Sequence, residues 1–269
     1  MTAFASLGSG SRGNGTLVDI GGELILVDCG FSLKQAEARC RRLGVGPGDL
    51  SAIVVTHEHS DHSGGVAALS HKYAVPIYAS YGTLKATRSE LVGCAINTHS
   101  VFSVGEVAVV PVIVPHDARE PTQFVFEHQE TRVGVISDLG QITPFVAEQY
   151  QRCQGLMMES NHDPQMLMRG RYPERVKRRI AGNLGHLSNE QAAGFLDAVG
   201  NPGLRVVIGH VSEENNHPDL LEETFARFRN EVGQLAFATQ DDGMDWIQVA
   251  ESGQRADVKP RSGTASPAA

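Results

Sequence analysis

Short runs of apolar residues, separated by Gly, Pro, Asp and Asn, recur along most of the chain. Several runs are nearly continuous and rich in Val and Ile, a pattern typical of strands that are buried on both faces. The expected strands are residues 16–20, 24–27, 52–55, 76–79, 107–114, 122–127, 132–136, 156–158 and 205–208. The sixth and seventh of these are expected to form a hairpin. Because Pro111 cannot donate a ladder hydrogen bond, its strand is expected at a sheet edge or with a bulge.

Apolar residues return at helical spacing in five other segments. The expected helices are residues 64–73, 144–152, 173–181, 189–199 and 218–232. The fourth has a start signal, because Ser188 is a favourable N-cap and Gln191 follows three residues later. Hairpins followed by mixed strands and helices predict an α/β chain with two mixed β-sheets and helices on the outside.

Composition limits the class of protein. Of the 269 residues, 41% are apolar and 20% are charged, which excludes a disordered chain and a disulfide-stapled miniprotein. We expect a single folded domain over residues 1–250. Residues 251–269 are rich in Gly, Ser, Pro and Ala and contain almost no large apolar residue, so we expect a disordered tail or a remnant of cloning.

Cysteine usage and hydropathy bear on the location of the protein. Cys29, Cys40, Cys94 and Cys153 form no CxxC pair, which argues against a thiolate zinc site and fits a reducing cytosol. No segment resembles a signal peptide, and no apolar run approaches the roughly 20 residues that span a bilayer. We therefore expect a cytoplasmic protein with no membrane partner.

The densest chemistry lies directly after the expected strand at 52–55. Residues 57–62 contain five imidazole or carboxylate side chains in six positions, which a core cannot easily bury and a surface does not require. Neutral His together with carboxylates suits divalent zinc, manganese or iron. His57 and His59 point to the same side of an extended segment, and Asp61 and His62 then turn toward a second position. One loop can thereby supply ligands to two metals.

Further residues of the same chemistry follow other expected strands. Because strand ends in α/β sheets are where loops converge on a site, these residues are candidates for the same centre. Those at the carboxyl ends of expected strands are Asp28, His57, His116, Asp138, Glu159 and His210.

The HxHxDH pattern after a buried strand resembles the metallo-β-lactamase superfamily of dinuclear hydrolases. The resemblance implies a four-layer αββα sandwich with two divalent ions, Zn²⁺ or Mn²⁺, at one edge between the sheets. It implies that Asp138 bridges the metals and that Asp28 orients the ligands from behind. The implied ligands are His57, His59 and His116 for the first metal, and Asp61, His62 and His210 for the second.

The superfamily also contains lactam, thioester and glyoxalase-type hydrolases, so the ligands alone do not identify the substrate. Residues 185–189 (Gly-His-Leu-Ser-Asn) resemble the extra histidine motif of the phosphodiesterase and nuclease branches, including the tRNA 3′-processing enzymes. The resemblance implies that His186 neutralises the phosphate or protonates the leaving oxygen. Its place before a helix start also favours anions. The alternative is a histidine that merely packs against that helix.

Three segments narrow the resemblance to the YycJ (WalJ) branch, which implies a DNA exonuclease: residues 9–14, 159–163 and 210–216. In the first, Ser11 and Asn14 are candidate substrate contacts, although the segment is equally explained by turn chemistry. In the second, His162 either supports the site through Asp163 or caps the following helix.

The net charge is −8, yet six of the eleven residues from 169 to 179 are cationic. Within this cluster, Arg171, Arg175 and Arg178 are candidate DNA contacts, because a local positive field attracts a polyanion. The alternative is a solvated helix face. Aromatic residues make up 6% of the chain, and no aromatic stacking platform is evident.

The sequence therefore predicts a dinuclear metal-dependent phosphodiesterase, and a DNA exonuclease in particular. In this prediction a hydroxide held by Asp138 and both metals attacks phosphorus. Asp61 completes the ligand set of the second metal, and His186 assists departure of the leaving group. The alternatives are a phosphodiesterase for nucleotides or cyclic phosphodiesters, an acyl or thioester hydrolase of the same fold, and a non-catalytic binding module.

Overall fold

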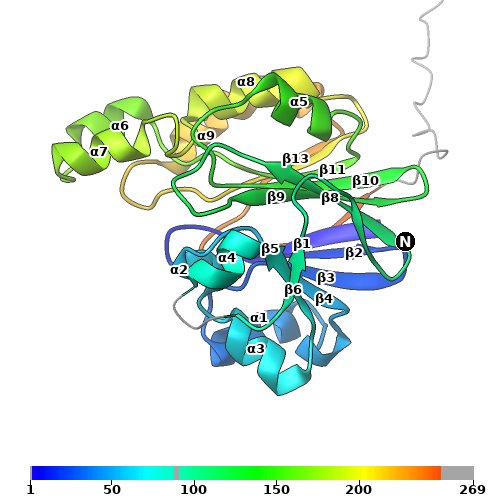
Figure 1. The fold of residues 1–269 in the computed structure, drawn as a ribbon. Helices are drawn as coiled ribbons and strands as arrows, with labels where there is room; N and C mark the ends of the chain where they lie inside the picture. Colours follow the sequence, from blue (N-terminus) through cyan, green and yellow to red (C-terminus); the bar gives the residue numbers. More distant parts are fainter. Residues whose placement is uncertain (1, 88–90, 250–269) are drawn as a thin grey trace, which may run out of the picture.

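Two seven-stranded β-sheets face each other, and helices cover their outer faces (Figure 1). The computed structural model describes residues 2–87 and 91–249. The helix–sheet–sheet–helix order confirms the predicted four-layer αββα sandwich. The expected tail at 251–269 lies outside the described residues, and the single-domain boundary at 250 stays a prediction.

The first sheet contains strands from both ends of the described chain. Its β1, β2 and β3 are antiparallel neighbours, β14 pairs antiparallel with β1, and β3 to β6 run parallel. Its strands in spatial order are β14 (Met244–Val249), β1 (Thr2–Gly8), β2 (Gly15–Ile20), β3 (Glu23–Val27), β4 (Ala52–Val55), β5 (Ile77–Ser80) and β6 (Cys94–Ile96).

The second sheet repeats this plan. Strands β7 to β10 are antiparallel neighbours, and β10 to β13 run parallel. Its strands in spatial order are β13 (Gln234–Phe237), β12 (Arg205–Gly209), β11 (Gly155–Glu159), β10 (Thr131–Ile136), β9 (Thr122–His128), β8 (Val107–Ile113) and β7 (Phe102–Val104). Both sheets are thus mixed, as predicted.

The helices fall into three groups in Figure 1. Helices α1 (Leu33–Arg42) and α3 (Val66–Tyr73) lie outside the first sheet, whereas α5 (Pro144–Tyr150), α8 (Asn189–Val199) and α9 (Pro218–Phe225) lie outside the second. The short α2 (Ser60–Ser63) and α4 (Tyr81–Ala86) lie toward one edge of the sandwich. At the same edge, α6 (Pro164–Arg169) and α7 (Glu174–Ile180) extend beyond the sheets as an arm. No helix of the described residues is long and apolar enough to cross a membrane.

Alternate residues of one strand enter different cores, which explains the continuous apolar runs. In β3, Val27 packs with the second sheet, whereas Leu26 packs with residues of α1 and α3. In β10, Val135 faces the first sheet, and Ile136 joins the core under α5, α8 and α9. Because both faces are covered, neither position tolerates a polar residue without loss of apolar burial.

Every expected strand and helix has a counterpart, with ends shifted by a few residues. The helix expected at 218–232 ends at Phe225 and continues as a 3₁₀ helix, Ala226–Asn230. Strand β8 is not at the sheet edge, but its register with β7 involves only Val107–Val109. Pro111 therefore has a strand partner on the β9 side alone, where it lies opposite Phe124.

Candidate metal centre and active-site pocket

The polar strand ends of both sheets converge at the edge of the sandwich where the α6–α7 arm lies. Asp28, Asp138 and His210 each follow a strand and have positive φ angles of 61°, 52° and 49°. Non-glycine residues avoid this left-handed region, at a free-energy cost of roughly 1 kcal/mol or more. The strained backbone turns these three side chains into the gap between the sheets, and such strain is typical of functional sites.

Three imidazoles form the first ligand group. His59 Nδ1 lies 3.0 Å from His57 Nε2 and 3.3 Å from His116 Nε2. His57 and His116 are buried, and His59 lies at the pocket surface. The three nitrogens face one another in an arrangement that could hold one ion, and their role as ligands of the first metal stays a prediction.

The second ligand group consists of Asp61, His62 and His210. Asp61 Oδ2 lies 3.5 Å from His62 Nε2 and 3.7 Å from His210 Nε2. Asp138 lies between the two groups, with Oδ2 at 2.9 Å from His62 Nε2 and Oδ1 at 3.9 Å from His116 Nε2. The predicted metal-bridging residue therefore touches both groups.

Two buried atoms of this centre make no hydrogen bond of good geometry among the described residues, although His62 Nε2 lies 2.9 Å from one of them, Asp138 Oδ2. They are Asp138 Oδ2 and His210 Nε2. Buried polar atoms are seldom left unsatisfied, because their desolvation is expensive. Imidazole and carboxylate donors suit Zn²⁺ or Mn²⁺, so the donor set and its orphaned atoms fit divalent metal ions.

The charge states of His57, His116 and Asp138 also suit a bound cation. Burial, reinforced by the neighbouring His62, lowers the pKa of His57 well below its ordinary value, so its imidazole is neutral. Burial likewise lowers the pKa of His116. Burial opposes ionisation of Asp138, but His210 and His62 outweigh it and lower the pKa of this carboxyl well below its usual range. Neutral imidazoles beside ionised carboxylates are the forms that ligate metals. Burial opposes protonation of His62 and His210, but Asp138 outweighs it and raises the pKa of both, that of His210 to about 10, so these two imidazoles would release a proton when they bind a metal.

Asp28 orients two of the candidate ligands. Its Oδ2 lies 2.8 Å from His62 Nδ1 and accepts a hydrogen bond from Thr56 Oγ1 at 2.7 Å. The same hydroxyl lies 2.9 Å from His57 Nδ1. Because Asp28 and Thr56 engage the Nδ1 atoms, the Nε2 atoms of His57 and His62 are turned toward the ligand groups. This geometry agrees with the orienting role that the sequence predicts for Asp28.

Glu159 connects the residues that the second sheet contributes to the centre. Its fully buried carboxylate accepts hydrogen bonds from the backbone N–H groups of Asp138 at 3.0 Å, Leu139 at 3.2 Å and Leu187 at 2.8 Å. Its Oε2 also lies 3.2 Å from both His186 Nδ1 and His210 Nδ1. Burial opposes ionisation of Glu159, but the hydrogen bonds from the two histidines dominate and lower its pKa to about 2.

His186 lies beside the candidate metal centre and not behind the helix start. Its Nδ1 is 3.5 Å from Asp138 Oδ1, and its ring lies 5.3 Å from that of His116 and 5.2 Å from that of His210. Since Nδ1 is engaged by Glu159, Nε2 is the ring nitrogen left for a substrate. The expected cap at Ser188 is confirmed, with a complete capping box to Gln191.

The loop at residues 9–14 braces ligands from both sheets. Ser9 Oγ accepts a hydrogen bond from His210 N at 2.7 Å, and Asn14 Nδ2 lies 3.1 Å from His62 Nε2. Asn14 is buried and does not line the pocket that opens over the candidate metal centre, whereas Ser11 does. Asn14 therefore does not lie where the predicted substrate contact requires it, and instead supports the candidate ligand His62.

A buried amide network joins the loops that carry His186 and His210. Asn161 Nδ2 donates to His210 O at 3.0 Å, and Asn161 N donates to Leu187 O at 3.0 Å. Asn216 Nδ2 donates to Asn161 O at 3.1 Å and to Asn189 Oδ1 at 2.8 Å. These three asparagines thus hold both histidine loops in one position.

The two alternatives for His162 are also settled in part. Asp163, and not His162, is the N-cap of α6, since its side chain accepts a hydrogen bond from Met166 N at 2.7 Å. His162 is buried, and its carbonyl accepts a hydrogen bond from Asn189 N at 2.9 Å. His162 therefore helps to hold the loop that carries His186.

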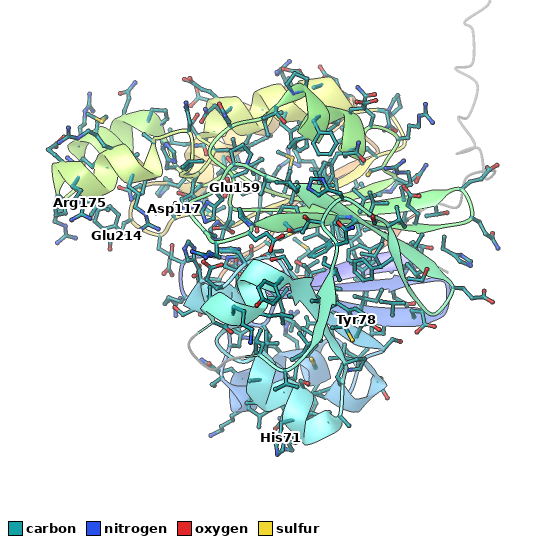
Figure 2. All side chains as sticks on the ribbon, viewed as in Figure 1. His71, Tyr78, Asp117, Glu159, Arg175 and Glu214 are labelled. Atoms are coloured by element: carbon teal, nitrogen blue, oxygen red, sulfur yellow. The ribbon has the colours of Figure 1, made fainter. Side chains whose placement is uncertain are left out.

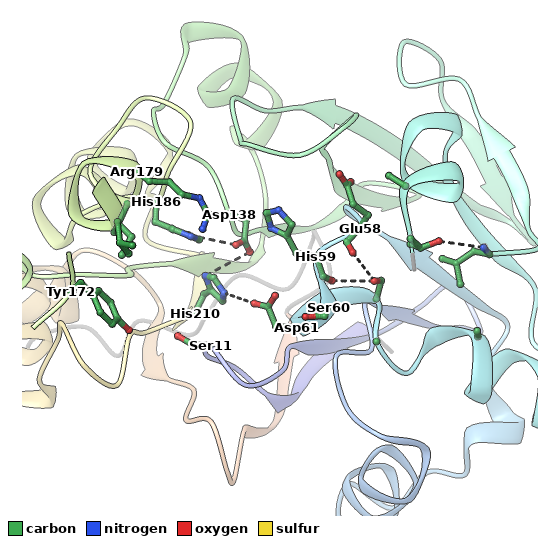
Figure 3. A pocket seen from close by; sticks show the side chains of 18 residues that line it. Ser11, Glu58, His59, Ser60, Asp61, Asp138, Tyr172, Arg179, His186 and His210 are labelled. Carbon is green, nitrogen blue, oxygen red and sulfur yellow. Dashed lines mark hydrogen bonds and ion pairs between the residues drawn. The ribbon is translucent and has the colours of Figure 1, made fainter. Parts of the chain in front are cut away.

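A pocket of about 710 Å³ opens over this centre (Figure 3). On the side of the α6–α7 arm it is lined by Tyr172, Val176, Arg179 and Ile180. Dashed lines in Figure 3 join His186 to Asp138 and His210 to Asp61. A substrate in the pocket thus lies between the arm and the candidate ligands.

The basic cluster is only partly at the pocket. Arg171, Arg175 and Arg178 are exposed and do not line it, and Arg175 lies at the outer part of the arm (Figure 2). Of the six cations, Arg179 alone lines the pocket. Sequence reasoning included Arg179 in the cluster without selecting it, because the rotation of α7 depends on how the arm packs.

Glu159 was found by its place at a strand end, but its partners were not predictable from sequence. They come from β10, the His186 loop and the end of β12, which meet only in the folded chain. Thr56 is also a missed residue, although its place directly before His57 at the end of β4 is a usable signal.

Known proteins resemble the chain over nearly its whole described length. A family model for the Beta-lactamase superfamily domain matches residues 23–211, which include every candidate ligand. The exodeoxyribonuclease YycJ of Bacillus anthracis is 34% identical over 237 residues, which cover 86% of this chain and 90% of that protein. The exodeoxyribonuclease WalJ of Streptococcus pneumoniae serotype 2 is 33% identical over 252 residues, which cover 90% of this chain and 91% of that protein.

Among solved structures, the metallo-beta-lactamase fold protein YhfI from Bacillus subtilis aligns with a TM-score of 0.69 at 14% sequence identity. The alignment covers 92% of this chain and 100% of that chain. At this identity the likeness concerns the fold alone, and it agrees with the layer order described above.

Proposed function

Because this chain belongs to the metallo-β-lactamase superfamily of metal-dependent hydrolases, in its YycJ/WalJ-like branch, we propose that it is a metal-dependent exodeoxyribonuclease that works with two divalent ions. The observation that carries the proposal is the placement of Asp138. It lies between two ligand groups and also beside His186, whose Nδ1 is 3.5 Å from Asp138 Oδ1.

In this proposal the metal ligands are those predicted from the sequence. His57, His59 and His116 hold one ion, Asp61, His62 and His210 hold the other, and Asp138 is shared. When bound, two such ions supply Lewis-acid stabilisation of phosphoryl oxygens and lower the pKa of water toward neutrality. The donor set suits both Zn²⁺ and Mn²⁺.

The protein's own groups have distinct tasks in the reaction. The carboxylates of Asp138 and Asp61 accept hydrogen bonds from the attacking water and orient it toward phosphorus. Glu159 holds His186 Nδ1–H, so a protonated His186 donates from Nε2 to the oxygen of the breaking P–O bond. The new P–O bond forms as the old one breaks, the attacking water gives a proton to one of the two carboxylates, which releases it to solvent, and the proton of His186 leaves with the alcohol product.

The exposed cations and the loop at residues 9–14 supply substrate contacts in this proposal. Arg171, Arg175 and Arg178 attract DNA phosphates that lie outside the pocket, because they carry unburied positive charge on an otherwise acidic protein. Ser11 contacts the strand within the pocket, which it lines.

The test is an assay of metal-reconstituted protein on end-labelled single- and double-stranded DNA and on RNA of the same sequence. We expect stepwise shortening of DNA from one end, abolished in His57→Ala and by chelation. Equal digestion of RNA would contradict the DNA preference. Hydrolysis of a small phosphodiester without DNA degradation would support a small-molecule phosphodiesterase, and turnover of a thioester alone would support an acyl hydrolase.

A further inference from the structure

Resting on the proposed function, we infer that the pocket-facing side of α7 and Tyr172, which precedes the helix by two residues, form a nucleoside subsite. Tyr172, Val176 and Ile180 pack against the base and sugar of the nucleotide next to the scissile phosphate. Arg179 contacts the phosphate on the far side of that nucleotide. The subsite would recognise the end of a DNA strand by its nucleoside, independently of base identity.

The helical spacing separates the two faces of α7. Arg179 and Ile180 follow Val176 by three and four residues, so both lie on the same face as Val176, and all three line the pocket. Arg178 lies on the opposite face and is exposed. The pocket face is thus an apolar stripe that ends in one cation, whereas the outer face is purely polar.

This combination of an aromatic ring, aliphatic side chains and a guanidinium suits a nucleotide. Bases of any sequence stack on an aromatic face, and Arg binds phosphate. The pocket volume of about 710 Å³ lies within the range of roughly 300–1,000 Å³ that encloses ligands of nucleotide size. Small residues, Ala67 and Ala86, line the pocket from the other half of the fold and leave room for the base.

Arg179 is held at the metal edge by an ion pair. Its Nε and Nη2 donate to Asp117, with Nη2 at 3.3 Å from Oδ1, and the pair leaves Nη1 for another anion. Asp117 Oδ1 lies 3.5 Å from His116 Nε2. A phosphate bound by Arg179 would therefore lie next to the centre that cleaves its neighbour.

The subsite and His186 lie on one continuous segment. His186 N donates to Ile180 O at 2.9 Å, and Asp117 N donates to Leu184 O at 3.0 Å. The end of α7, the Arg179 partner and the candidate acid are thereby joined by backbone hydrogen bonds. A nucleoside seated on α7 would set its phosphate relative to His186.

The first experiment compares p-nitrophenyl phosphodiesters of the same leaving group. The substrates are methyl p-nitrophenyl phosphate and the thymidine 5′- and 3′-(p-nitrophenyl phosphates). We expect wild-type protein to prefer one thymidine ester, and Tyr172→Ala to raise the KM of that ester by roughly tenfold. The methyl ester should change by less than twofold, Tyr172→Phe should resemble wild type, and Phe145→Ala, on α5, is the matched exposed-aromatic control.

The second experiment tests Arg179 with the dinucleotide pTpT, which is too short to reach the outer arginines. We expect Arg179→Ala to weaken inhibition of methyl p-nitrophenyl phosphate hydrolysis by pTpT and to reduce its salt slope by about one. Arg41→Ala, an exposed arginine of α1 that does not line the pocket, should leave both unchanged, and metal content should stay that of wild type in both variants.

The outcomes separate the subsite from the proposed function. If no phosphodiester is hydrolysed, the proposed function is wrong, and calorimetric binding of thymidine 5′-monophosphate to wild type and Tyr172→Ala still decides the subsite. If wild-type protein degrades DNA but shows no preference for a thymidine ester, the subsite is wrong and the exonuclease stands. Unchanged kinetics in both Tyr172→Ala and Arg179→Ala would also overturn the nucleoside subsite.

Discussion

His186 Nδ1 lies 3.2 Å from Glu159 Oε2, and the same oxygen lies 3.2 Å from His210 Nδ1. One buried carboxylate therefore orients both the candidate acid and a candidate metal ligand. Through Asp138 N, at 3.0 Å from Oε2, it also fixes the backbone of the residue shared by the two ligand groups. Such supporting partners commonly matter almost as much as the ligands that they orient.

The first prediction concerns His186→Ala. If His186 acts on the phosphoryl group and does not bind a metal, this variant should keep its metal while its rate falls by roughly 10²–10⁴-fold. His57→Ala should lose both metal and activity. Metal content by mass spectrometry of the metal-loaded protein and initial rates on DNA would decide, and release of a metal from His186→Ala would identify His186 as a ligand.

The second prediction concerns Glu159→Gln. The amide has nearly the same shape, but it carries no charge and its NH₂ group cannot accept the two imidazole N–H groups. We expect roughly a 10–100-fold loss in metal affinity or activity, as for other groups that orient metal ligands. Titration with a fluorescent zinc chelator measures the affinity. Glu190→Gln, an exposed residue of α8, is the control, and equal affinity in Glu159→Gln and wild type would contradict the orienting role.

The third prediction concerns stoichiometry. Two ligand groups joined by Asp138 should bind close to two divalent ions per chain, and Asp138→Asn should reduce the content or affinity of both. Elemental analysis of protein purified without chelators checks this. A content well under one, which reconstitution with Zn²⁺ or Mn²⁺ does not raise, would be incompatible with the proposed centre.

Features that depend on neighbouring residues in the chain could be predicted from the sequence. The candidate ligands of the HxHxDH motif could be proposed from the sequence because they follow a single strand, and His116, Asp138 and His210 because each follows an apolar run. Strand β1 was missed because Thr2–Gly8 is made largely of small residues that carry no strand signal. Strand β14 was missed because its pattern alternates only weakly, and its pairing with β1 is set by the fold.

Contacts that depend on packing could not be predicted in the same way. The contacts of Glu159 need three separate segments to meet, and no spacing in the sequence encodes that meeting. The choice of Arg179 over Arg175 or Arg178 depends on the rotation of α7 about its own axis. Clustered cations give no periodic signal from which that rotation can be read.

The last prediction concerns the exposed cations of the arm. Cations that contact DNA phosphates displace condensed counterions, so binding weakens as salt rises, and removal of a contact flattens that dependence. Arg171, Arg175 and Arg178 lie outside the pocket. Arg171 Nη2 lies 3.9 Å from Glu214 Oε2, but both side chains are exposed, so this ion pair contributes little to stability and leaves the arginine able to bind DNA. The triple change to Ala should therefore weaken binding of long DNA and reduce the salt slope by roughly two to three.

The matched control removes three exposed arginines elsewhere, Arg41, Arg227 and Arg229, and so changes the net charge equally. Fluorescence anisotropy with labelled DNA at several salt concentrations measures both slopes. Hydrolysis of methyl p-nitrophenyl phosphate should stay within a few-fold in both variants, because this substrate reaches only the pocket. If the arm variant and the control lower the slope equally, the effect comes from net charge, and the outer arginines form a solvated surface. DNA would then be held by Arg179 and the pocket alone, and binding of pTpT and of long DNA should show the same dependence on salt.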